Sequence, residues 1–363
     1  MAVSAVNDVL GHFWSTSISS TAGYLRYSYG GYATTVNSQQ VLWADAVMYD
    51  TMENTWAATG NVTLKGQLQS DWSHVKTEYT GSSITSCGTG SISPWQDDAG
   101  WGCFLMITAY NATNDATALS DAEALANNMF NRWYDSALGG GMWYRDAKDI
   151  KSLYQAACVL DYLKLYEITG TKSYLTHSLL CYTWLEKKML RTDGLYWCDY
   201  DTSSGTVAGI STPNAIHQAG SVSFLGGNMA MGVIHARLYK DTGEDIYRQR
   251  ALRTATALRT RLIDINGVYI DDRDAWTDAT FAGEWAREVL TLPGASSSDI
   301  QILENTASAV YANDRTSDGY YGGCWDGPVG TPGDAWSNGG STPQQIMTSA
   351  EAVNMIAAAA NLP

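Results

Sequence analysis

Two adjacent aspartates lie between two tryptophans in the segment Trp95-Gln-Asp97-Asp98-Ala-Gly-Trp101. Cleavage of a glycosidic bond needs two carboxyl groups, one acting on the leaving oxygen and one stabilising the oxocarbenium-like transition state. Sugar rings present flat apolar faces, which an indole ring covers with a large area. Two acids and two stacking surfaces within seven residues therefore indicate carbohydrate chemistry.

The acid pair is predicted to lie at the start of a helix. Ser93 suits a helix N-cap and Pro94 the first helical position, and the apolar run after Gly102 continues helically. Asp97 and Asp98 would then occupy the opening turns, with carboxyl groups close to the ~5 Å separation of retaining enzymes. The helix dipole favours one ionised carboxylate, and its charge raises the pKa of the other. A capping acid with a solvated neighbour is the alternative for so common a pair.

A second acidic cluster, formed by Asp271, Asp272, Asp274 and Asp278, is a rival site. Clustered carboxylates suit hard cations, but this cluster lacks the alternating ligand spacing of a calcium loop. We therefore expect a solvated loop or a rim that positions substrate, and no metal site. The five histidines form no triad-like motif with Ser or Cys, and no glycine-rich loop has the form that cradles phosphate.

Composition narrows the class of partner. The net charge of −15 and the absence of a basic run disfavour nucleic acid and anionic membrane surfaces. No stretch approaches the ~20 apolar residues of a membrane span. The 14 Trp and 22 Tyr against 5 Phe indicate that many polar-tipped rings line a wet groove, although about half would serve as core or rim.

The six cysteines match neither a metal-binding pattern nor a dense disulfide scaffold. Three lie in apolar helical runs and are predicted to be buried thiols, and three lie in polar loops where they could pair: Cys103, Cys158 and Cys181, then Cys87, Cys198 and Cys324. The first residues show no signal peptide, as in a mature domain after signal removal. We expect a secreted or cell-surface protein.

A repeated break between helices sets the expected architecture. Apolar-periodic helices end at Thr59-Gly60, Thr113-Asn114, Thr169-Gly170 and Thr242-Gly243, and a second helix follows each break. Glycine suits the left-handed C′ position, and the Thr, Asn or Asp that follows can cap the next helix. Each hairpin of about 55–70 residues cannot bury its apolar face alone. About six of them closed in a ring give an all-α, (α/α)6 toroid, a single domain over residues 1–363.

Glycine- and aromatic-rich segments connect the hairpins, at residues 139–146, 193–199 and 318–326. Irregular loops that carry aromatic and acidic side chains together are often functional. We expect them to form the face of the toroid that holds a central cleft, with closure of the barrel mouth as the alternative role.

From about Gln40 onward the chain resembles glycoside hydrolase family 76, the endo-α-1,6-mannanase family. The resemblance is carried by six motifs in order, beginning with an opening hairpin and the Asp-Asp motif and ending with a last helix. They are Leu42-Trp43-Ala-Asp45 with Thr59-Gly60-Asn61, Trp95 to Trp101 continuing into Ala109-Tyr110, Gly139-Gly-Gly-Met-Trp143 with Lys151, Phe224 to Gly232, Phe281-Ala-Gly283 to Arg287, and Gln345 to Glu351.

The resemblance implies an (α/α)6 fold, retention of configuration and no cofactor. Transferred onto this sequence, Asp97 would be the nucleophile and Asp98 the general acid/base. The chain departs from the family pattern at Gln96, Ser152 and residues 226–228. These departures bear on which glycan is cleaved, and where, more than on the class of reaction.

We predict further substrate contacts beside the acid pair. Aromatic sugar platforms would be Trp95, Trp101, Trp143 and Tyr144, and polar positioning groups would be Gln96, Lys151, Asn228 and Arg287. An ion pair of Arg287 with Glu284 or Glu288 is an equally good interpretation of that residue.

The leading expectation is a monomeric, retaining, endo-acting hydrolase of α-1,6-linked mannan, with a polysaccharide or oligosaccharide as its partner. A transglycosidase using the same site is the nearest alternative. A terpene cyclase would need an Asp at the start of an Asp-x-Asp-Asp motif, where this chain has Trp95. A catalytically silent mannan-binding protein predicts that neither Asp97 nor Asp98 matters.

Overall fold

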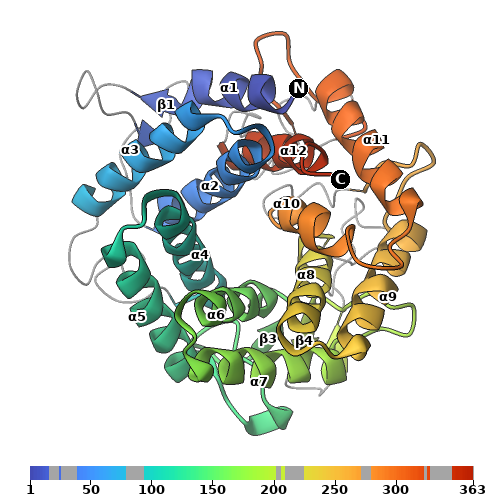
Figure 1. Ribbon diagram of the computed structural model, residues 1–363. Helices are drawn as coiled ribbons and strands as arrows, with labels where there is room; N and C mark the ends of the chain where they lie inside the picture. The colour runs from blue at the N-terminus through green and yellow to red at the C-terminus, as the bar shows by residue number, and fades with distance from the viewer. Residues whose placement is uncertain are drawn as a thin grey trace.

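The computed structural model describes residues 1–15, 24–25, 39–78, 94–201, 206–208, 225–270, 279–322, 325–327 and 346–362. The α-helices within these ranges form two concentric rings (Figure 1). The predicted all-α, (α/α)6 architecture is confirmed.

The inner ring is a closed circle of helices. Each contacts the next in chain order, and the last contacts the first, so that red α12 lies beside blue α2 in Figure 1. Inner helices are buried nearly all round: every residue of α8 from Leu225 to Leu238 is buried. The ring consists of α2 (Gln39–Thr59), α4 (Gln96–Thr113), α6 (Gln155–Thr169), α8 (Leu225–Thr242), α10 (Ala282–Glu284) continued by the π-helical turn η3 (Trp285–Val289), and α12 (Ile346–Ala359).

The outer ring covers the gaps between inner helices. Helix α3 contacts α2 and α4, α5 contacts α4 and α6, and α1 contacts α12 and α2. Outer helices bury one stripe, as the spacing of Ala118, Ala122, Leu125 and Met129 shows in α5. The outer helices are α1 (Ala2–Phe13), α3 (Val62–Glu78), α5 (Ala116–Trp133), α7 (Lys172–Lys188), α9 (Asp245–Arg261) and α11 (Ser297–Asn313). None of the described helices is both long and apolar enough to cross a membrane.

The predicted breaks are confirmed, and threonine has a specific role in them. Helices α2, α4, α6 and α8 each end at the threonine of a break. The Thr169 hydroxyl donates to the carbonyl of Leu165 at 2.7 Å and accepts the Thr171 N–H at 3.1 Å, while Gly170 has φ +70°. The same two bonds and a positive φ recur at the other breaks, at Thr59, Thr113 and Thr242.

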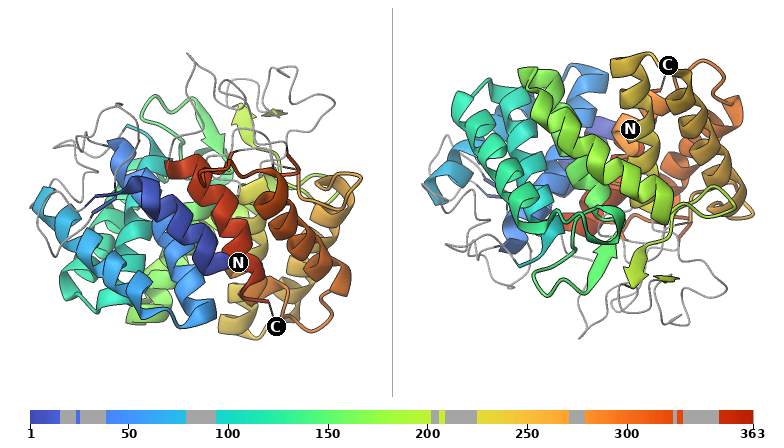
Figure 2. Two further views of the ribbon diagram at one scale, coloured as in Figure 1. Left: turned by 90° about the horizontal axis from the view of Figure 1, so that it is seen from above. Right: turned by 90° about the horizontal axis from the view of Figure 1, so that it is seen from below.

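Short strands lie at the end of the ring where the inner helices begin (Figure 2). Strands β3 (Ile150–Ser152), β4 (Asp199–Asp201) and β5 (Thr206–Ala208) form an antiparallel sheet in that order. Ser152 pairs with Asp199 in its register. A second pair joins β1 (Trp14–Ser15) to β2 (Tyr24–Leu25). The two chain termini lie near each other in both figures, beside α1 and α12.

Three connections from an outer to an inner helix share one arrangement. A chain reversal is closed by an isolated bridge, such as Tyr134 with Met142 or Leu190 with Tyr196. A side chain in the first turn of the next inner helix then accepts a backbone N–H of the bridge. These acceptors are Gln155 for Met142, Asn228 for Tyr196 and Ser349 for Tyr321. The loops predicted to form one face are thus held by polar side chains of the inner helices.

Many of the aromatic side chains belong to the core. Seven tryptophans in the described residues are buried: Trp72, Trp101, Trp133, Trp143, Trp184, Trp285 and Trp325. The predicted burial of Cys103, Cys158 and Cys181 is confirmed, and Cys198 is buried as well. Cys87 and Cys324, two of the three cysteines predicted to be able to pair, lie outside the described residues.

Candidate active site

Asp97 and Asp98 lie in the first turn of inner helix α4, as predicted. The helix begins later than predicted, at Gln96, with Trp95 as an N-cap that makes no side-chain cap hydrogen bond. Ser93, the predicted cap, lies outside the described residues.

Backbone pairing with a distant segment fixes this helix start. Trp95 forms a bridge with Arg145, the Gln96 N–H donates to the Tyr144 carbonyl at 2.9 Å, and the Asp146 N–H donates to the Pro94 carbonyl at 3.0 Å. The acid pair is therefore fastened to the segment that carries Tyr144.

Asp97 has an environment unlike that of a surface carboxyl. Burial raises the pKa of Asp97 to about 7, and the neighbouring charge of Asp98 adds to this shift. Hydrogen bonds from Tyr144 and from the backbone N–H groups of Asp97 and Asp98 oppose it. The Tyr144 hydroxyl donates to Asp97 Oδ2 at 3.1 Å, whereas Asp97 Oδ1 is buried and has no hydrogen-bond partner among the described residues. One carboxylate oxygen is thus held by Tyr144, and the other is buried with its acceptor capacity unused.

Aromatic rings surround this carboxyl group. Tyr144 stacks on Tyr154 with ring centroids 5.5 Å apart, and its centroid lies 5.3 Å from that of Trp95. The guanidinium group of Arg145 lies over the Trp95 ring at 5.2 Å. Trp95 and Tyr144 keep partial exposure beside Asp97, as sugar platforms require. Tyr154, the N-cap of α6, was missed by sequence reasoning, although it follows the predicted Lys151 by three positions.

Asp199 is a further acid that sequence reasoning did not place at this site. It lies on β4 opposite Ser152, and its charge contributes to raising the pKa of Tyr144, after burial and the charge of Asp97. Burial raises the pKa of Asp199 itself, and a hydrogen bond with Ser152 opposes the shift. The only sequence signal was its position in a loop rich in aromatic residues, because the strand pairing is long-range.

Gln96 and Trp101 flank the acid pair in sequence but point into the core. Gln96 is fully buried, and its side-chain amide donates to the thiol of Cys158. Trp101 is 2% exposed and stacks on Phe281 with centroids 5.9 Å apart. Neither side chain has a face open to a sugar in this structure, which favours a packing role over the predicted substrate contact.

Lys151 lies beneath the glycine-rich loop. Its ammonium group donates to the carbonyls of Gly140 at 2.6 Å and Gly141 at 3.2 Å, and to two further carbonyls at 3.3 Å. It also lies 4.7 Å from the ring centroid of Trp143, which is 7% exposed. Burial lowers the pKa of Lys151 to about 8. These contacts favour a structural role for Lys151, which holds the loop in place. Trp143 is largely buried, which favours a packing role for its ring.

Asn228 and Arg287 contact protein groups in this structure. Asn228 is fully buried, and its carbonyl oxygen accepts the Tyr196 N–H at 2.9 Å. Arg287 donates to the side-chain oxygen of Asn54 at 2.6 Å.

The alternative ion pairs of Arg287 are not seen. Arg237, from α8, instead lies 3.6 Å from Glu284 and 3.4 Å from Glu288. The nearby Gly283 is required by packing, since a Cβ there would lie 2.1 Å from an Asn54 side-chain atom.

The described residues contain no group of three or more His, Cys, Asp or Glu side chains arranged to hold a metal ion. Asp271, Asp272, Asp274 and Asp278, the rival acidic cluster, lie outside the described ranges.

A closed ring of helical hairpins, with paired carboxyl groups at the start of an inner helix, defines an (α/α)6 protein equipped for glycoside chemistry. The sequence profile of glycosyl hydrolase family 76 matches residues 4–361, and the chain belongs to this family. It is therefore a glycoside hydrolase.

Solved structures share the fold. The GH76A α-1,6-mannanase of Salegentibacter sp. HEL1_6 has a TM-score of 0.74 at 18% identity, covering 99% of this chain and 98% of that chain. An inactive variant of that enzyme, with two consecutive aspartates replaced by alanine, is in complex with α-1,6-mannotetrose (TM-score 0.76, 17% identity, 99% and 97% covered). Dfg5 from Chaetomium thermophilum, in complex with glucosamine, has a TM-score of 0.71 at 14% identity (99% and 88% covered). No curated protein sequence matched the chain.

Proposed function

We propose that this protein is a retaining, endo-acting hydrolase of α-1,6-linked mannan, with Asp97 as nucleophile and Asp98 as general acid/base. The observation that carries the proposal is the pair of consecutive carboxyl groups in the first turn of α4, one of them bound by Tyr144. Membership of family 76 supports it. So does the α-1,6-mannanase with the same fold, whose variant lacking two consecutive aspartates is inactive.

The proposed reaction has two steps. In the first, a carboxylate oxygen of Asp97 attacks the anomeric carbon while Asp98 gives its proton to the leaving glycosidic oxygen. In the second, Asp98 takes a proton from water, and the resulting nucleophile releases the sugar from Asp97 with overall retention. The Tyr144 hydroxyl and the helix N-terminus would stabilise Asp97 as a carboxylate before attack and again on release.

The rings of Trp95 and Tyr144 are the proposed sugar platforms, since both are partly exposed beside Asp97. Tyr154 supports the Tyr144 ring from behind. We also propose a monomeric enzyme that acts at or outside the cell surface, where a polysaccharide substrate would be met.

Asp97→Asn and Asp98→Asn test the assignment of the acid pair. Each variant should lower turnover of linear α-1,6-mannan by about 10²–10⁴-fold while still binding the glycan, because the amide keeps the shape but neither attacks nor transfers a proton. Asp121→Asn, on outer helix α5, is the matched control and should keep full activity. Full activity in either site variant would refute the assignment.

Product analysis tests the remaining parts of the proposal. Sizing the products from linear α-1,6-mannan, branched mannan and α-1,6-glucan identifies the glycan and separates internal from terminal cleavage. NMR of the first product should show the α-anomer. If an added acceptor sugar captures most of the cleaved mannosyl groups, the enzyme is a transglycosidase using the same carboxyl groups.

A further inference from the structure

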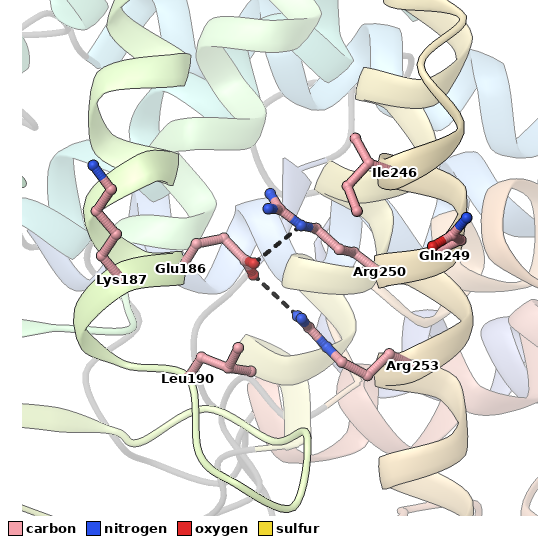
Figure 3. Close-up of a pocket in the computed structure, with 7 residues that line it drawn as sticks. All are labelled: Glu186, Lys187, Leu190, Ile246, Gln249, Arg250 and Arg253. Carbon is pink, nitrogen blue, oxygen red and sulfur yellow. Dashed lines mark hydrogen bonds and ion pairs between the residues drawn. The ribbon is translucent and has the colours of Figure 1, made fainter.

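A pocket of about 520 Å³ lies on the outside of the ring, between outer helices α7 and α9 (Figure 3). This volume lies within the range of small-molecule sites. The lining residues are Glu186, Lys187 and Leu190 from the α7 side and Ile246, Gln249, Arg250 and Arg253 from α9. None of them belongs to the proposed active site on inner helix α4.

The pocket is cationic in an otherwise acidic protein. Its lining has three basic side chains and one carboxylate, whereas the chain as a whole has 22 Lys and Arg against 37 Asp and Glu. Arg250 and Arg253 are three positions apart on one face of α9, where like charges repel. Figure 3 shows both guanidinium groups reaching across the pocket toward Glu186.

Glu186 compensates only one of the two arginine charges. Its carboxylate lies 3.3 Å from Arg250 Nε and 3.1 Å from Arg253 Nη2. It also contacts the buried groups beneath it, His235 at 3.2 Å and the Tyr196 hydroxyl. The Glu186 side chain is 9% exposed, whereas those of Arg250 and Arg253 are 31% and 33% exposed. The acid thus lies below the guanidinium groups, which face the open side of the pocket.

Both guanidinium groups retain unused donors. Arg250 uses Nε for Glu186 and Nη1 for the Tyr182 hydroxyl, and its Nη2 makes no hydrogen bond in the described structure. Arg253 binds through Nη2, and its Nη1 makes no hydrogen bond within the described residues, whereas its Nε is buried and out of reach of a ligand. The Lys187 ammonium points away from the arginines in Figure 3, so it adds charge without a direct contact.

We propose that this pocket binds a phosphate group, either as the free anion or carried on a sugar. At neutral pH a phosphate carries one to two negative charges and presents several acceptor oxygens, which match the free N–H groups of two guanidiniums and the excess positive charge of the pocket. A planar carboxylate offers two oxygens and a single charge, so it fits two separate guanidiniums less well. The proposal does not depend on the reaction proposed for Asp97 and Asp98.

Calorimetric titration of the full chain with inorganic phosphate, glucose 6-phosphate and glucuronate tests the proposal. Phosphate should bind saturably, and Arg250→Gln and Arg253→Gln should each weaken binding about tenfold, because each removes a charged donor pair. Arg250→Lys, which keeps the charge and loses the fork, should weaken it less. Arg248→Gln is the matched control, since Arg248 lies on α9 but pairs with Asp245 outside the pocket.

The three ligands separate the sources of the phosphate group. Tighter binding of glucose 6-phosphate than of phosphate supports a sugar phosphate, and equal binding supports the free anion. The proposal is overturned if neither phosphate ligand binds, if the arginine variants that retain the native circular dichroism spectrum bind phosphate as well as Arg248→Gln does, or if glucuronate binds more tightly than both.

Discussion

Tyr144 joins two functions in one side chain, because its hydroxyl donates to Asp97 while its ring packs between Trp95 and Tyr154. The hydrogen bond stabilises the ionised form of Asp97 against burial and the charge of Asp98. Tyr144 is the only side chain among the groups that lower the pKa of Asp97, and its hydroxyl can be removed while the ring is kept.

Tyr144→Phe should raise the pKa of Asp97, because the carboxylate loses a donor while burial is unchanged. If Asp97 is the nucleophile, activity requires its ionised form, so the acidic limb of kcat/KM against pH moves to higher pH. If Asp97 is instead the general acid, the alkaline limb moves to higher pH. The pH–rate profile of the variant thus assigns the two roles.

Tyr110→Phe, on the same helix α4 but not bound to Asp97, is the control and should leave both limbs in place. An unchanged or downward-shifted profile in Tyr144→Phe would show that the hydroxyl does not control Asp97.

Lys151→Met should destabilise the fold more than it impairs catalysis. The change leaves several buried carbonyls of the glycine-rich loop without a donor, at a cost of about 1–3 kcal/mol for each unsatisfied group. Urea unfolding measures the loss, and kcat and KM of the folded enzyme measure the function. A rise in KM with unchanged stability would instead restore the substrate-positioning role predicted from sequence.

Residue types in the sequence distinguish active-site residues from residues that hold loops only in part. Asp97 and Asp98 could be proposed as the acid pair because their two carboxyl groups stand at adjacent positions in the sequence. Lys151 and Asn228 stand in loops and helix starts that suit either a ligand or a backbone partner, and their partners are distant in sequence. Asp199 came to the site only through strand pairing.

At the level of elements, the threonine at each break joins the end of one helix to the start of the next. Thr169→Val keeps the shape but removes both the bond to Leu165 and the acceptor for the Thr171 N–H. We expect a loss of about 1 kcal/mol in the free energy of unfolding. Thr176→Val is the matched control, because Thr176 lies at an exposed position of α7 and bonds only the carbonyl four residues earlier. Equal losses in both variants would contradict the bridging role.

Helix ends were easier to predict than helix starts. The ends of α2, α4, α6 and α8 follow from local chemistry, namely a threonine followed by a residue at positive φ. The start of α4 is set by pairing with residues 144–146, which no local pattern reveals. The short sheet could not be predicted either, because its strands have only three residues each and β3 pairs with β4, a segment distant in the sequence.

For the whole molecule, the interior of the ring contains acids whose pKa is raised. Burial raises the pKa of Asp50 to about 8, the charge of Glu284 adds to this, and Lys164, Asn354 and Arg287 oppose it. Folded protein therefore keeps a proton on Asp50 that the unfolded chain, with an ordinary pKa of 3.8, releases. This group makes the free energy of unfolding fall as pH rises from about 4 to 8.

Asp50→Asn should remove that part of the pH dependence. Relative to the unchanged protein, the variant should gain about 1.4 kcal/mol for each pH unit between the two pKa values. Urea unfolding of both proteins at pH 5 and pH 7 measures this double difference, in which the contributions of other groups cancel. A constant difference between the two proteins would show that Asp50 is ionised in the folded state.

Closure of the inner ring has a consequence for the covalent order of the chain. Helix α12 packs on α1 and α2 just as other neighbours pack on one another, and the two termini lie close together. The last and first helices are thus joined by packing alone, whereas the other neighbouring hairpins are joined by packing and by the continuous chain. The same ring is compatible with circular permutation. A short linker would join the present termini, and the chain would be cut at one of the threonine breaks to give new termini.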